Sequence, residues 1–336
     1  MKIAIIGATG LVGRKMMQVL DESGLPVDEL YLAASERSKG SKITFQGREL
    51  ILETIGEVLN RKPDAALFSA GGDISMEWAE KFADAGVKVI DNSSAWRMHP
   101  EIKLIVPEIN GFDLTPEDKI IANPNCSTIQ LVMVLNPLHE RYGIKRVLVS
   151  TYQSVSGSGN KGIGQMMDER TGTEGKKAYP HTIDQNCLPH CDAFTENGYT
   201  REEMKLMNES RKILKLPALK LSATAVRVPV QGGHSESVNI EFENKPDVDE
   251  IREILSQSAG VIVQDDPGKN LYPMPLLAKD QNEVFVGRIR ADLSNENAIN
   301  LWIVADNIRK GAATNAVQIL GLLMHCGFLE KDQVSQ

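Results

Sequence analysis

The pattern of hydrophobic positions in the first third of the chain alternates between short apolar runs and segments with apolar residues at helical spacing. Strands of a parallel sheet are buried on both faces by helices, so they appear as short, nearly continuous apolar runs between helical patterns. The predicted strands span residues 2–6, 30–34, 65–70 and 87–91, and the predicted helices span 12–22 and 78–85. We therefore predict a doubly wound α/β domain of the Rossmann type.

The pattern changes after residue 126, where longer strand candidates are separated by polar, glycine-rich connections. These strand candidates are residues 145–155, 219–230, 237–243, 283–291 and 299–306, with helical patterns at 201–214 and 248–258. Long strands with few intervening helices predict an α+β domain with a mostly antiparallel sheet. We divide the chain into residues 1–125, completed by the C-terminal helix 311–336, and residues 126–310.

Composition favours a soluble globular protein, because 42% of the 336 residues are hydrophobic and 24% are charged. The net charge of −8, with scattered Lys and Arg, argues against a nucleic-acid partner. No apolar stretch approaches membrane-spanning length, and the first apolar run is too short for the core of a signal peptide. Four cysteines do not make the dense framework of a secreted scaffold. We expect a cytoplasmic protein without a membrane partner.

One segment places three soft ligands close together: Cys187, His190 and Cys191, with His181 upstream. Zinc would use such side chains, but the chain has no second matching cluster, and Pro189 supplies no ligand. We therefore expect no metal site here.

A glycine-rich loop follows the first predicted strand and opens the first predicted helix. In that context glycines let the backbone approach a pyrophosphate, and the helix N-terminus supplies N–H groups and positive potential. The spacing, Gly-x-x-Gly-x-x-Gly, departs from the commonest dinucleotide fingerprint. The residues expected to contact the cofactor are Gly7, Thr9, Gly10, Leu11, Val12 and Gly13.

The end of the second strand bears on the choice of dinucleotide. An acidic residue there would bind a ribose 2′-hydroxyl and repel a 2′-phosphate. Ser35, Arg37 and Ser38 offer two hydroxyls and a guanidinium, which suit a phosphate, so we predict NADP. Glu36 in the same run leaves use of NAD open.

Cys126 stands where an extended approach meets the first turn of a predicted helix, residues 127–141. Unpaired N–H groups and the helix dipole favour the thiolate there, which is the reactive form of cysteine. An isolated cysteine more often packs as a small hydrophobic side chain, but the surrounding motifs favour a nucleophile. Asn125, directly before it, is expected to cap the helix or to orient the cofactor.

Several motifs together resemble the aspartate-semialdehyde dehydrogenase family. Besides the glycine loop they are SSAWRM at 93–98, PNCST at 124–128, TYQSVSG at 151–157, RVPV at 227–230 and GHSES at 233–237. The resemblance implies an NADP-dependent oxidoreductase that interconverts L-aspartate 4-semialdehyde and 4-phospho-L-aspartate. It also implies a place in the synthesis of lysine (through diaminopimelate), methionine, threonine and isoleucine, and a homodimer or tetramer whose second domain is catalytic and mediates dimerisation.

The resemblance also assigns roles to residues. Catalytic positions are Cys126 as nucleophile, His234 as acid/base and Gln153 as the amide that orients the substrate. Substrate-binding positions are Arg227 for the α-carboxylate, Glu209 for the α-ammonium, and Arg97 with Lys212 for phosphate. Additional cofactor contacts are Ser156, Gly157 and Asn307.

These residue types suit the chemistry. Addition of the thiolate to an aldehyde gives a thiohemiacetal that can lose hydride and become a thioester, which phosphate can then attack. Histidine exchanges protons near neutral pH, and arginine grips a carboxylate or phosphate with two N–H groups.

In contrast, residues 173–197 carry no motif with a chemical meaning. The resemblance implies an interface element there.

Two alternatives remain at the level of sequence. N-Acetyl-γ-glutamyl-phosphate reductase uses the same thioester chemistry, but its acylated substrate nitrogen is neutral, so the carboxylate of Glu209 favours a free amino acid. A non-catalytic dinucleotide-binding protein would be expected to have a broken site, whereas Cys126, Gln153, Arg227 and His234 are all present.

Overall fold

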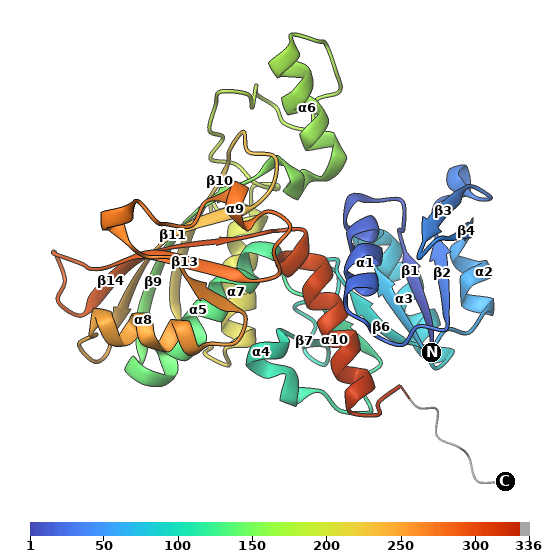
Figure 1. The fold of residues 1–336 in the computed structure, drawn as a ribbon, viewed down its shortest axis with the longest axis horizontal. Helices are drawn as coiled ribbons and strands as arrows, with labels where there is room; N and C mark the ends of the chain where they lie inside the picture. The colour runs from blue at the N-terminus through green and yellow to red at the C-terminus, as the bar shows by residue number, and fades with distance from the viewer. Residues whose placement is uncertain (330–336) are drawn as a thin grey trace. The chain divides into compact units, whose positions relative to one another are not determined.

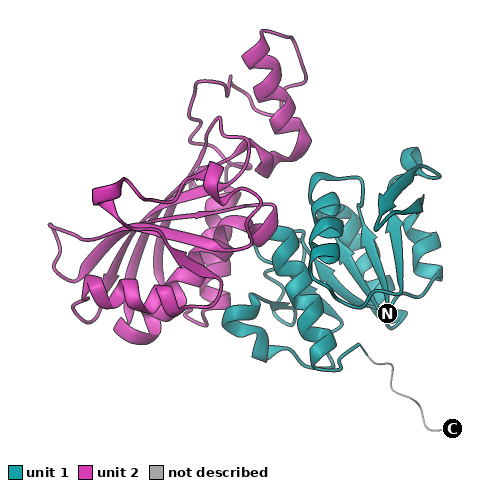
Figure 2. Cartoon of the chain, viewed as in Figure 1, with its two compact units in different colours: residues 1–124, 312–336 teal, residues 125–311 magenta. Residues whose placement is uncertain are grey.

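The computed structural model describes residues 1–329, and the chain forms two compact units (Figure 2). Within the described residues, unit 1 comprises residues 1–124 and 312–329, and unit 2 comprises residues 125–311. The chain thus enters unit 2 immediately before Cys126 and leaves it at Gly311.

Unit 1 is built on a sheet with the strand order β3-β4-β2-β1-β5-β6-β8-β7 (Figure 1). Every neighbouring pair is parallel except β3 and β4, which are antiparallel. The strands are β1 (Lys2–Ile6), β2 (Glu29–Ala33), β3 (Lys42–Phe45), β4 (Arg48–Glu53), β5 (Ala65–Phe68), β6 (Lys88–Asp91), β7 (Lys103–Leu104) and β8 (Ile120–Ala122).

Helices α1 (Leu11–Glu22), α2 (Ile55–Asn60), α3 (Gly72–Asp84), α4 (Pro107–Asn110) and α10 (Thr314–His325) complete this unit. Helix α10 contacts α1, α4 and β6, and its Ile319 and Leu320 join the same core as Ile3 and Ile5 of β1. Asn315 of α10 donates hydrogen bonds to the carbonyl oxygen of Ile105 and to the side-chain oxygen of Asn123. The parallel sheet with helical cover confirms the predicted Rossmann-type fold class.

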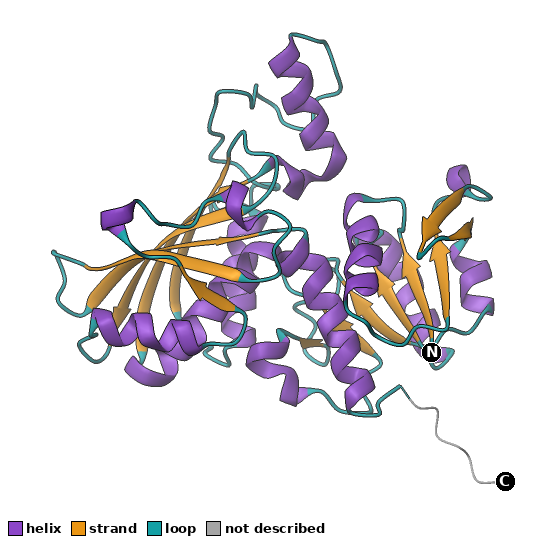
Figure 3. Ribbon diagram, viewed as in Figure 1, coloured by secondary structure: helices purple, strands orange, loops and turns teal. Residues whose placement is uncertain are grey.

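Unit 2 contains a second sheet (Figure 3), and its strand order is β10-β9-β11-β14-β13-β12. β11 is antiparallel to β9 and β14, and β13 is antiparallel to β14, whereas the two edge strands pair in parallel. The strands are β9 (Ile144–Gln153), β10 (Lys220–Arg227), β11 (His234–Phe242), β12 (Val261–Val263), β13 (Val284–Ala291) and β14 (Ala298–Ala305). This is the α+β domain with a mostly antiparallel sheet that the sequence predicts.

Alternation along β9 distinguishes the two faces of this sheet. Val147, Val149 and Thr151 are buried, whereas Leu148 and Tyr152 are exposed. Helices α5 (Cys126–Tyr142), α7 (Arg201–Ile213) and α8 (Val248–Gln257) contact the sheet, while α6 (Gly159–Thr171) contacts the 3-10 turn after β9 and α9 (Pro275–Ala278) contacts β14. The inward side chains of β9 therefore lie under helices, and its outward ones remain open.

The structure differs from the predicted elements in a few places. The strands β3, β4, β7, β8 and β12 and the helices α2, α4, α6 and α9 were not predicted. Half of the residues of β3 and β4 are exposed, and the apolar run of β4 is only three residues long. Helix α6 carries three glycines, which weaken its helical signal. The strand predicted at 219–230 ends at Arg227, because Pro229 cannot donate to a sheet ladder.

Candidate active site

Three predicted site residues stand side by side at strand ends in unit 2. Arg227, the last residue of β10, pairs with Gln153, the last residue of β9. The pairing of Ser235 with Tyr152 places His234, the first residue of β11, next to Gln153 on the other side. All three side chains are buried. The sheet register therefore assembles a cation, an amide and an imidazole from distant parts of the sequence.

Cys126 is the first residue of helix α5, and Asn125 is its N-cap. The Asn125 side-chain oxygen accepts hydrogen bonds from the backbone N–H groups of Ser127 (3.0 Å) and Thr128 (3.2 Å), which confirms the predicted cap. The N–H of Asn125 itself donates to Oε2 of Glu209 on α7 at 2.7 Å. The backbone around the cysteine is thus fixed on both sides.

Glu202, which the sequence analysis did not single out, connects this helix start to the strand ends. Its Oε1 accepts from Nδ2 of Asn125 (2.9 Å) and from Nε2 of Gln153 (3.2 Å). Nε2 of Gln153 also donates to Oγ of Ser127 at 3.0 Å. A carboxylate only accepts hydrogen bonds, so it turns both amide groups with their nitrogens toward itself.

The Glu202 carboxylate remains charged although it is buried. Burial alone would raise its pKa, but the charge of Lys205 and the hydrogen bond from Asn125 outweigh burial and lower the pKa to about 2. Nζ of Lys205 lies 3.1 Å from Oε2 of Glu202 and 2.7 Å from Asp192. Glu202 and Glu209 lie two turns apart on the same face of α7. This spacing was the feature of the sequence that could have indicated a role for Glu202 beside Glu209.

Arg227 is held by residues 173–197, the segment in which the sequence shows no interpretable motif. Its backbone N–H and C=O pair with those of Leu188, at 2.8 and 2.9 Å, and its guanidinium carbon lies 5.9 Å from the ring centroid of Tyr179. Nη1 donates to the carbonyl oxygen of Ser154 at 2.8 Å, and Nε has no hydrogen-bond partner among residues 1–329. Residues 173–197 thus support the arginine, and their role in an interface stays a prediction.

The cysteines of that segment differ in their surroundings. Cys187 is exposed, whereas Cys191 is buried, and burial raises the pKa of its thiol to about 12. In the described part of the chain, no group of three or more His, Cys, Asp or Glu side chains is arranged to hold a metal ion.

His234 is fully buried, and a short polar network surrounds it. Its Nδ1 lies 3.1 Å from both the backbone nitrogen and Oγ of Ser154. The side-chain oxygen of Asn307 accepts from the N–H of Gly233 (3.0 Å) and from Oγ of Ser154 and of Ser156 (both 3.1 Å). The amide oxygen of Asn307 is therefore used to brace the loops around His234, and its predicted cofactor contact remains a prediction.

Glu209 and Lys212 both lie on α7, one turn apart, as predicted. Glu209 is buried. Partial burial of the Lys212 ammonium lowers its pKa, whereas the negative charge of Glu209 acts to raise it. A lysine held in this way still presents a cation, which suits an anionic ligand.

The glycine loop in unit 1 has the geometry of a nucleotide cradle. The N–H groups of Gly7 and Ala8 both donate to the carbonyl oxygen of Ala33 at the end of β2. A Cβ on Gly13 would lie 2.3 Å from the carbonyl oxygen of Gly7, so only glycine lets α1 approach the loop this closely. Helix α1 begins after Gly10 without a side-chain cap. Its first N–H groups are thus not used by a capping side chain.

The residues predicted to distinguish NADP from NAD lie just after β2, where a contact with the adenine ribose would be made. Ser35 and Arg37 are exposed and Ser38 is partly buried, in and before the 3-10 turn Glu36–Ser38 that follows β2. The carboxyl end of β2, beside the glycine loop, is where dinucleotide-binding domains hold the adenine ribose. A dinucleotide therefore fits the residues present.

Arg97 lies in unit 1, in the turn after β6. Its Nε and Nη2 donate to the carbonyl oxygens of Asn123 and Asn92, both at 2.9 Å. These carbonyls follow β8 and β6, so the guanidinium joins the carboxyl ends of two strands. Phosphate binding by Arg97 stays a prediction.

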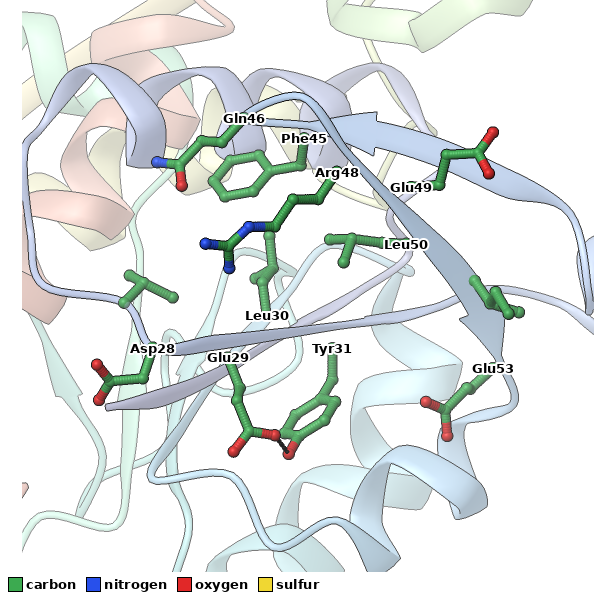
Figure 4. A pocket seen from close by; sticks show the side chains of 12 residues that line it. Asp28, Glu29, Leu30, Tyr31, Phe45, Gln46, Arg48, Glu49, Leu50 and Glu53 are labelled. Carbon is green, nitrogen blue, oxygen red and sulfur yellow. Dashed lines mark hydrogen bonds between the residues drawn. The ribbon is translucent and has the colours of Figure 1, made fainter.

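A separate hollow in unit 1 lies along β2 and β4 (Figure 4). Its lining includes Asp28, Glu29, Glu49 and Glu53 but only one cation, Arg48. Carboxylates repel phosphate groups, so this hollow does not suit a dinucleotide. Within residues 1–329, no helix has the length and apolar character needed to cross a membrane.

Comparison with known proteins identifies both units. The family model described as "Semialdehyde dehydrogenase, NAD binding domain" matches residues 2–115, and "Semialdehyde dehydrogenase, dimerisation domain" matches residues 135–310. A protein of Aquifex aeolicus named aspartate-semialdehyde dehydrogenase is 53% identical over 98% of this chain and 99% of its own length. A protein of Bacillus subtilis with the same name is 45% identical over 94% and 95%.

Solved structures agree with these sequence comparisons. Aspartate semialdehyde dehydrogenase II of Vibrio cholerae, complexed with ASA, is 44% identical with a TM-score of 0.92, covering 96% of this chain and 98% of that one. Aspartate semialdehyde dehydrogenase with NADP from Candida albicans is 25% identical with a TM-score of 0.76, covering 97% and 99%.

We predict that Glu202→Gln destabilises the protein by about 2–3 kcal/mol at neutral pH, because it removes a charged acceptor shared by two buried amides. The lowered pKa makes this loss depend on pH. The stabilisation from Glu202 is complete above its ordinary value of 4.5 and is lost as pH falls toward about 2. Chemical denaturation at a series of pH values measures the difference between the variant and the wild type.

Glu196→Gln is the matched control, because it makes the same chemical change on an exposed loop. It should change stability by less than about 0.5 kcal/mol. A stability difference for Glu202→Gln that stays constant from neutral pH down to pH 3 would contradict a charged, stabilising Glu202.

Proposed function

Because this chain belongs to the aspartate-semialdehyde dehydrogenase family, we propose that it interconverts L-aspartate 4-semialdehyde and 4-phospho-L-aspartate with NADP as hydride carrier. This reaction lies on the route to lysine, methionine, threonine and isoleucine. The observation that carries the proposal is the hydrogen-bonded link from the N-cap of Cys126, through Glu202, to Gln153 between Arg227 and His234. We place the reaction in the cytoplasm.

The proposed nucleophile is Cys126. An aldehyde does not readily give up hydride, so the thiolate first adds to its carbon and forms a thiohemiacetal. NADP supplies hydride transfer when it is bound. Loss of hydride leaves a thioester on Cys126. Inorganic phosphate attacks this thioester, which releases the acyl phosphate and regenerates the thiolate. In the biosynthetic direction Cys126 displaces phosphate instead.

The proposed substrate contacts follow from charge. Arg227 has a buried Nε without a hydrogen-bond partner in the described chain, so a donor remains for the substrate α-carboxylate. Glu209 would hold the α-ammonium, which favours a free amino acid over an acylated one. Lys212, one turn along α7, and Arg97 are the proposed phosphate ligands.

The proposed cofactor contacts are the glycine loop for the pyrophosphate and Ser35, Arg37 and Ser38 for the 2′-phosphate. The Candida albicans relative, whose structure contains NADP, supports the choice of NADP. Ser156, Gly157 and Asn307 are proposed as further contacts.

We also propose a homodimer formed through the open face of the unit 2 sheet. The matching family model is a dimerisation domain, and it covers this sheet. Leu148 and Tyr152 of β9 are more than a third exposed there, and the Tyr152 ring packs against Trp302 of β14 at 5.3 Å. An apolar and aromatic sheet face matches a second copy of itself.

The function is tested by NADP⁺ reduction with L-aspartate 4-semialdehyde, with and without inorganic phosphate. Turnover should require phosphate. N-Acetylglutamate semialdehyde should not react, because its acylated nitrogen cannot pair with Glu209. Equal turnover of both aldehydes would overturn the substrate assignment, and no turnover from folded, NADP-binding protein would overturn the function.

We expect Cys126→Ser to lower kcat on the order of 10³-fold or more, because the hydroxyl is a far weaker nucleophile than the thiolate. NADP binding should persist, since the glycine loop is a separate motif. Cys187→Ser is the matched control, because this cysteine is exposed and outside the proposed site. Steady-state kinetics and NADP titration measure both effects. Loss of cofactor affinity together with activity would contradict this division of roles.

Leu148→Asp should convert the dimer to a monomer, because it places a charge in the middle of an apolar contact. Met76→Asp, at a more exposed apolar position on α3 of unit 1, is the control and should leave the dimer intact. Sedimentation velocity measures the mass. A Leu148→Asp protein that still sediments as a dimer would place the interface elsewhere.

A further inference from the structure

The ammonium group of Lys205 lies between two carboxylates. Its Nζ atom is 3.1 Å from Oε2 of Glu202, one turn earlier on α7, and 2.7 Å from Oδ2 of Asp192 in the segment 173–197. The side chains of Lys205 and Glu202 are 23% and 9% exposed, so little water screens the attraction between their charges. This ion pair is therefore stronger than an exposed pair of the same geometry.

The backbone around Asp192 holds this residue against the start of α7. Its φ of 68° lies in the left-handed region, which aspartate adopts more readily than most residues. Its Oδ1 accepts a hydrogen bond from the N–H of Ala193 at 2.7 Å. The carbonyl oxygen of Ala193 in turn accepts one from the N–H of Arg201, the first residue of α7, at 2.8 Å. The carboxylate that contacts Lys205 is therefore fixed by local geometry.

The two oxygens of Glu202 have different partners. Oε2 faces Lys205, whereas Oε1 accepts hydrogen bonds from Nε2 of Gln153 and Nδ2 of Asn125. An ionised carboxylate only accepts hydrogen bonds, so it admits one orientation of the Gln153 amide, with Nε2 toward Glu202. A protonated carboxyl also carries an O–H donor, and the amide could then turn its oxygen toward Glu202. The other partner of Nε2, Oγ of Ser127, can donate or accept, so the charge of Glu202 specifies the orientation of Gln153.

Lys205 is the main cation that keeps Glu202 ionised. Burial raises the pKa of Glu202, and the charge of Lys205 is the largest cause that lowers it, with a smaller effect from Arg227. The Cys191 thiol, with a pKa of about 12, and the His234 imidazole, with a pKa of about 3, are uncharged at neutral pH. The titratable groups on the elements around Glu202 are Glu203, Lys205 and Glu209 on α7, Cys191 and Asp192 in the segment 173–197, Cys126 at the start of α5, Arg227 at the end of β10 and His234 at the start of β11.

Building on the proposed function, we infer that Lys205 is a positioning residue, which keeps the Glu202 carboxylate ionised and so holds the Gln153 amide in the orientation used in the reaction. Asp192 holds Lys205 in place. Lys205 does this through the carboxylate between them, since Glu202 contacts Lys205 with one oxygen and Gln153 with the other.

This role gives the segment 173–197 a second connection to the site. Leu188 already pairs with the backbone of Arg227. Asp192 adds an ionic contact, through Lys205, to the group that orients the catalytic amide. A segment without a motif thus contributes to both the guanidinium and the amide.

The orientation of Gln153 is tested directly by ¹H–¹⁵N NMR of protein labelled at the glutamine side-chain amides, with its signal assigned by its loss in Gln153→Met. Glu202→Gln gives the position of this signal without a carboxylate. In the wild type we expect no change from pH 9 to pH 5, because the pKa of Glu202 is about 2. In Lys205→Met the signal should move toward its Glu202→Gln position as pH falls, because a buried carboxyl without its cation takes up a proton. A Lys205→Met signal that coincides with the wild-type signal at pH 5 would overturn the inference.

A second substitution separates the charge of Lys205 from its shape. Lys205→Met keeps most of the aliphatic stem but has no charge. Lys205→Arg keeps a cation between the two carboxylates, so its Gln153 signal should stay independent of pH, as in the wild type. Equal displacement of the signal in both variants would show that packing sets the amide and would contradict the inference.

Steady-state kinetics tests the consequence for turnover. Lys205→Met should lower kcat about tenfold at pH 6, the effect of one lost orienting hydrogen bond, and less at pH 9, where Glu202 regains its charge. KM for the semialdehyde should change little, because Arg227 and Glu209, the proposed substrate ligands, keep their charges. Lys176→Met, at an exposed lysine of the same segment, is the matched control and should leave kcat within about twofold at both pH values. A loss in Lys205→Met that is the same at every pH would indicate a purely structural role and would overturn the inference.

Asp192→Asn tests the residue that holds the lysine. It removes one carboxylate but leaves Lys205 on Glu202, so we expect kcat to fall only about threefold at pH 6. Its Gln153 signal should lie between those of the wild type and Glu202→Gln at pH 5, and this comparison also serves if Lys205→Met does not fold. A kcat and an amide signal identical to those of the wild type would contradict the role of Asp192.

Failure of this inference is distinguishable from failure of the proposed function. The NMR experiment needs no turnover, so it reports the orientation of Gln153 whichever substrate the enzyme uses. Absence of phosphate-dependent turnover would remove the function, whereas an unchanged Gln153 signal in Lys205→Met would remove only the role of Lys205.

Discussion

The site depends on one buried carboxylate, Glu202, because it connects three elements that the chain supplies separately. It accepts from Asn125 at the start of α5 and from Gln153 at the end of β9, and it stands on α7. Leaving such a charge buried without partners would be costly, so the carboxylate stabilises the fold only when Lys205 and both amides are in place. The orientation of Gln153 and the cap of the nucleophile's helix are therefore coupled through the same oxygen atom.

The register of the unit 2 sheet determines the positions of the other site residues. Side chains at paired positions of neighbouring strands have a spacing set by the ladder, and a slip of one residue would turn each of them to the opposite face. Arg227, Gln153 and His234 occupy one such row. Their neighbours Val226 and Tyr152 face the open side of the sheet, so the same register that assembles the site also creates the surface assigned to the dimer.

The sequence predicts most of what local pattern determines. The glycine loop, the cap at Asn125 and the strands that end at Gln153 and Arg227 all leave short-range signals, and so does the fold class. Glu202 was missed because Thr200 to Glu203 has the pattern of a capping box, and its carboxylates look like an exposed helix start. The spacing of Glu202 and Glu209 along the helix was the one sequence signal, and the packing of α7 against α5 shows that Glu202 points inward.

The contacts of Arg227 with Tyr179 and Leu188 could not be predicted from the sequence either, because they depend on a long-range backbone bridge from a segment with no periodicity. The hydrogen bonds of His234 are a further case. The residue type indicates a group that exchanges protons near neutral pH, but the backbone N–H of Ser154 that donates to Nδ1 leaves no trace in sequence, since every residue except proline has one.

Arg227 has two effects that follow from its single charge. It offers a grip for a carboxylate, and its field helps to keep His234 neutral. Burial is the larger cause of the lowered pKa of the imidazole, and the guanidinium acts in the same direction. The charge that suits a substrate carboxylate therefore also favours the neutral form of the neighbouring imidazole.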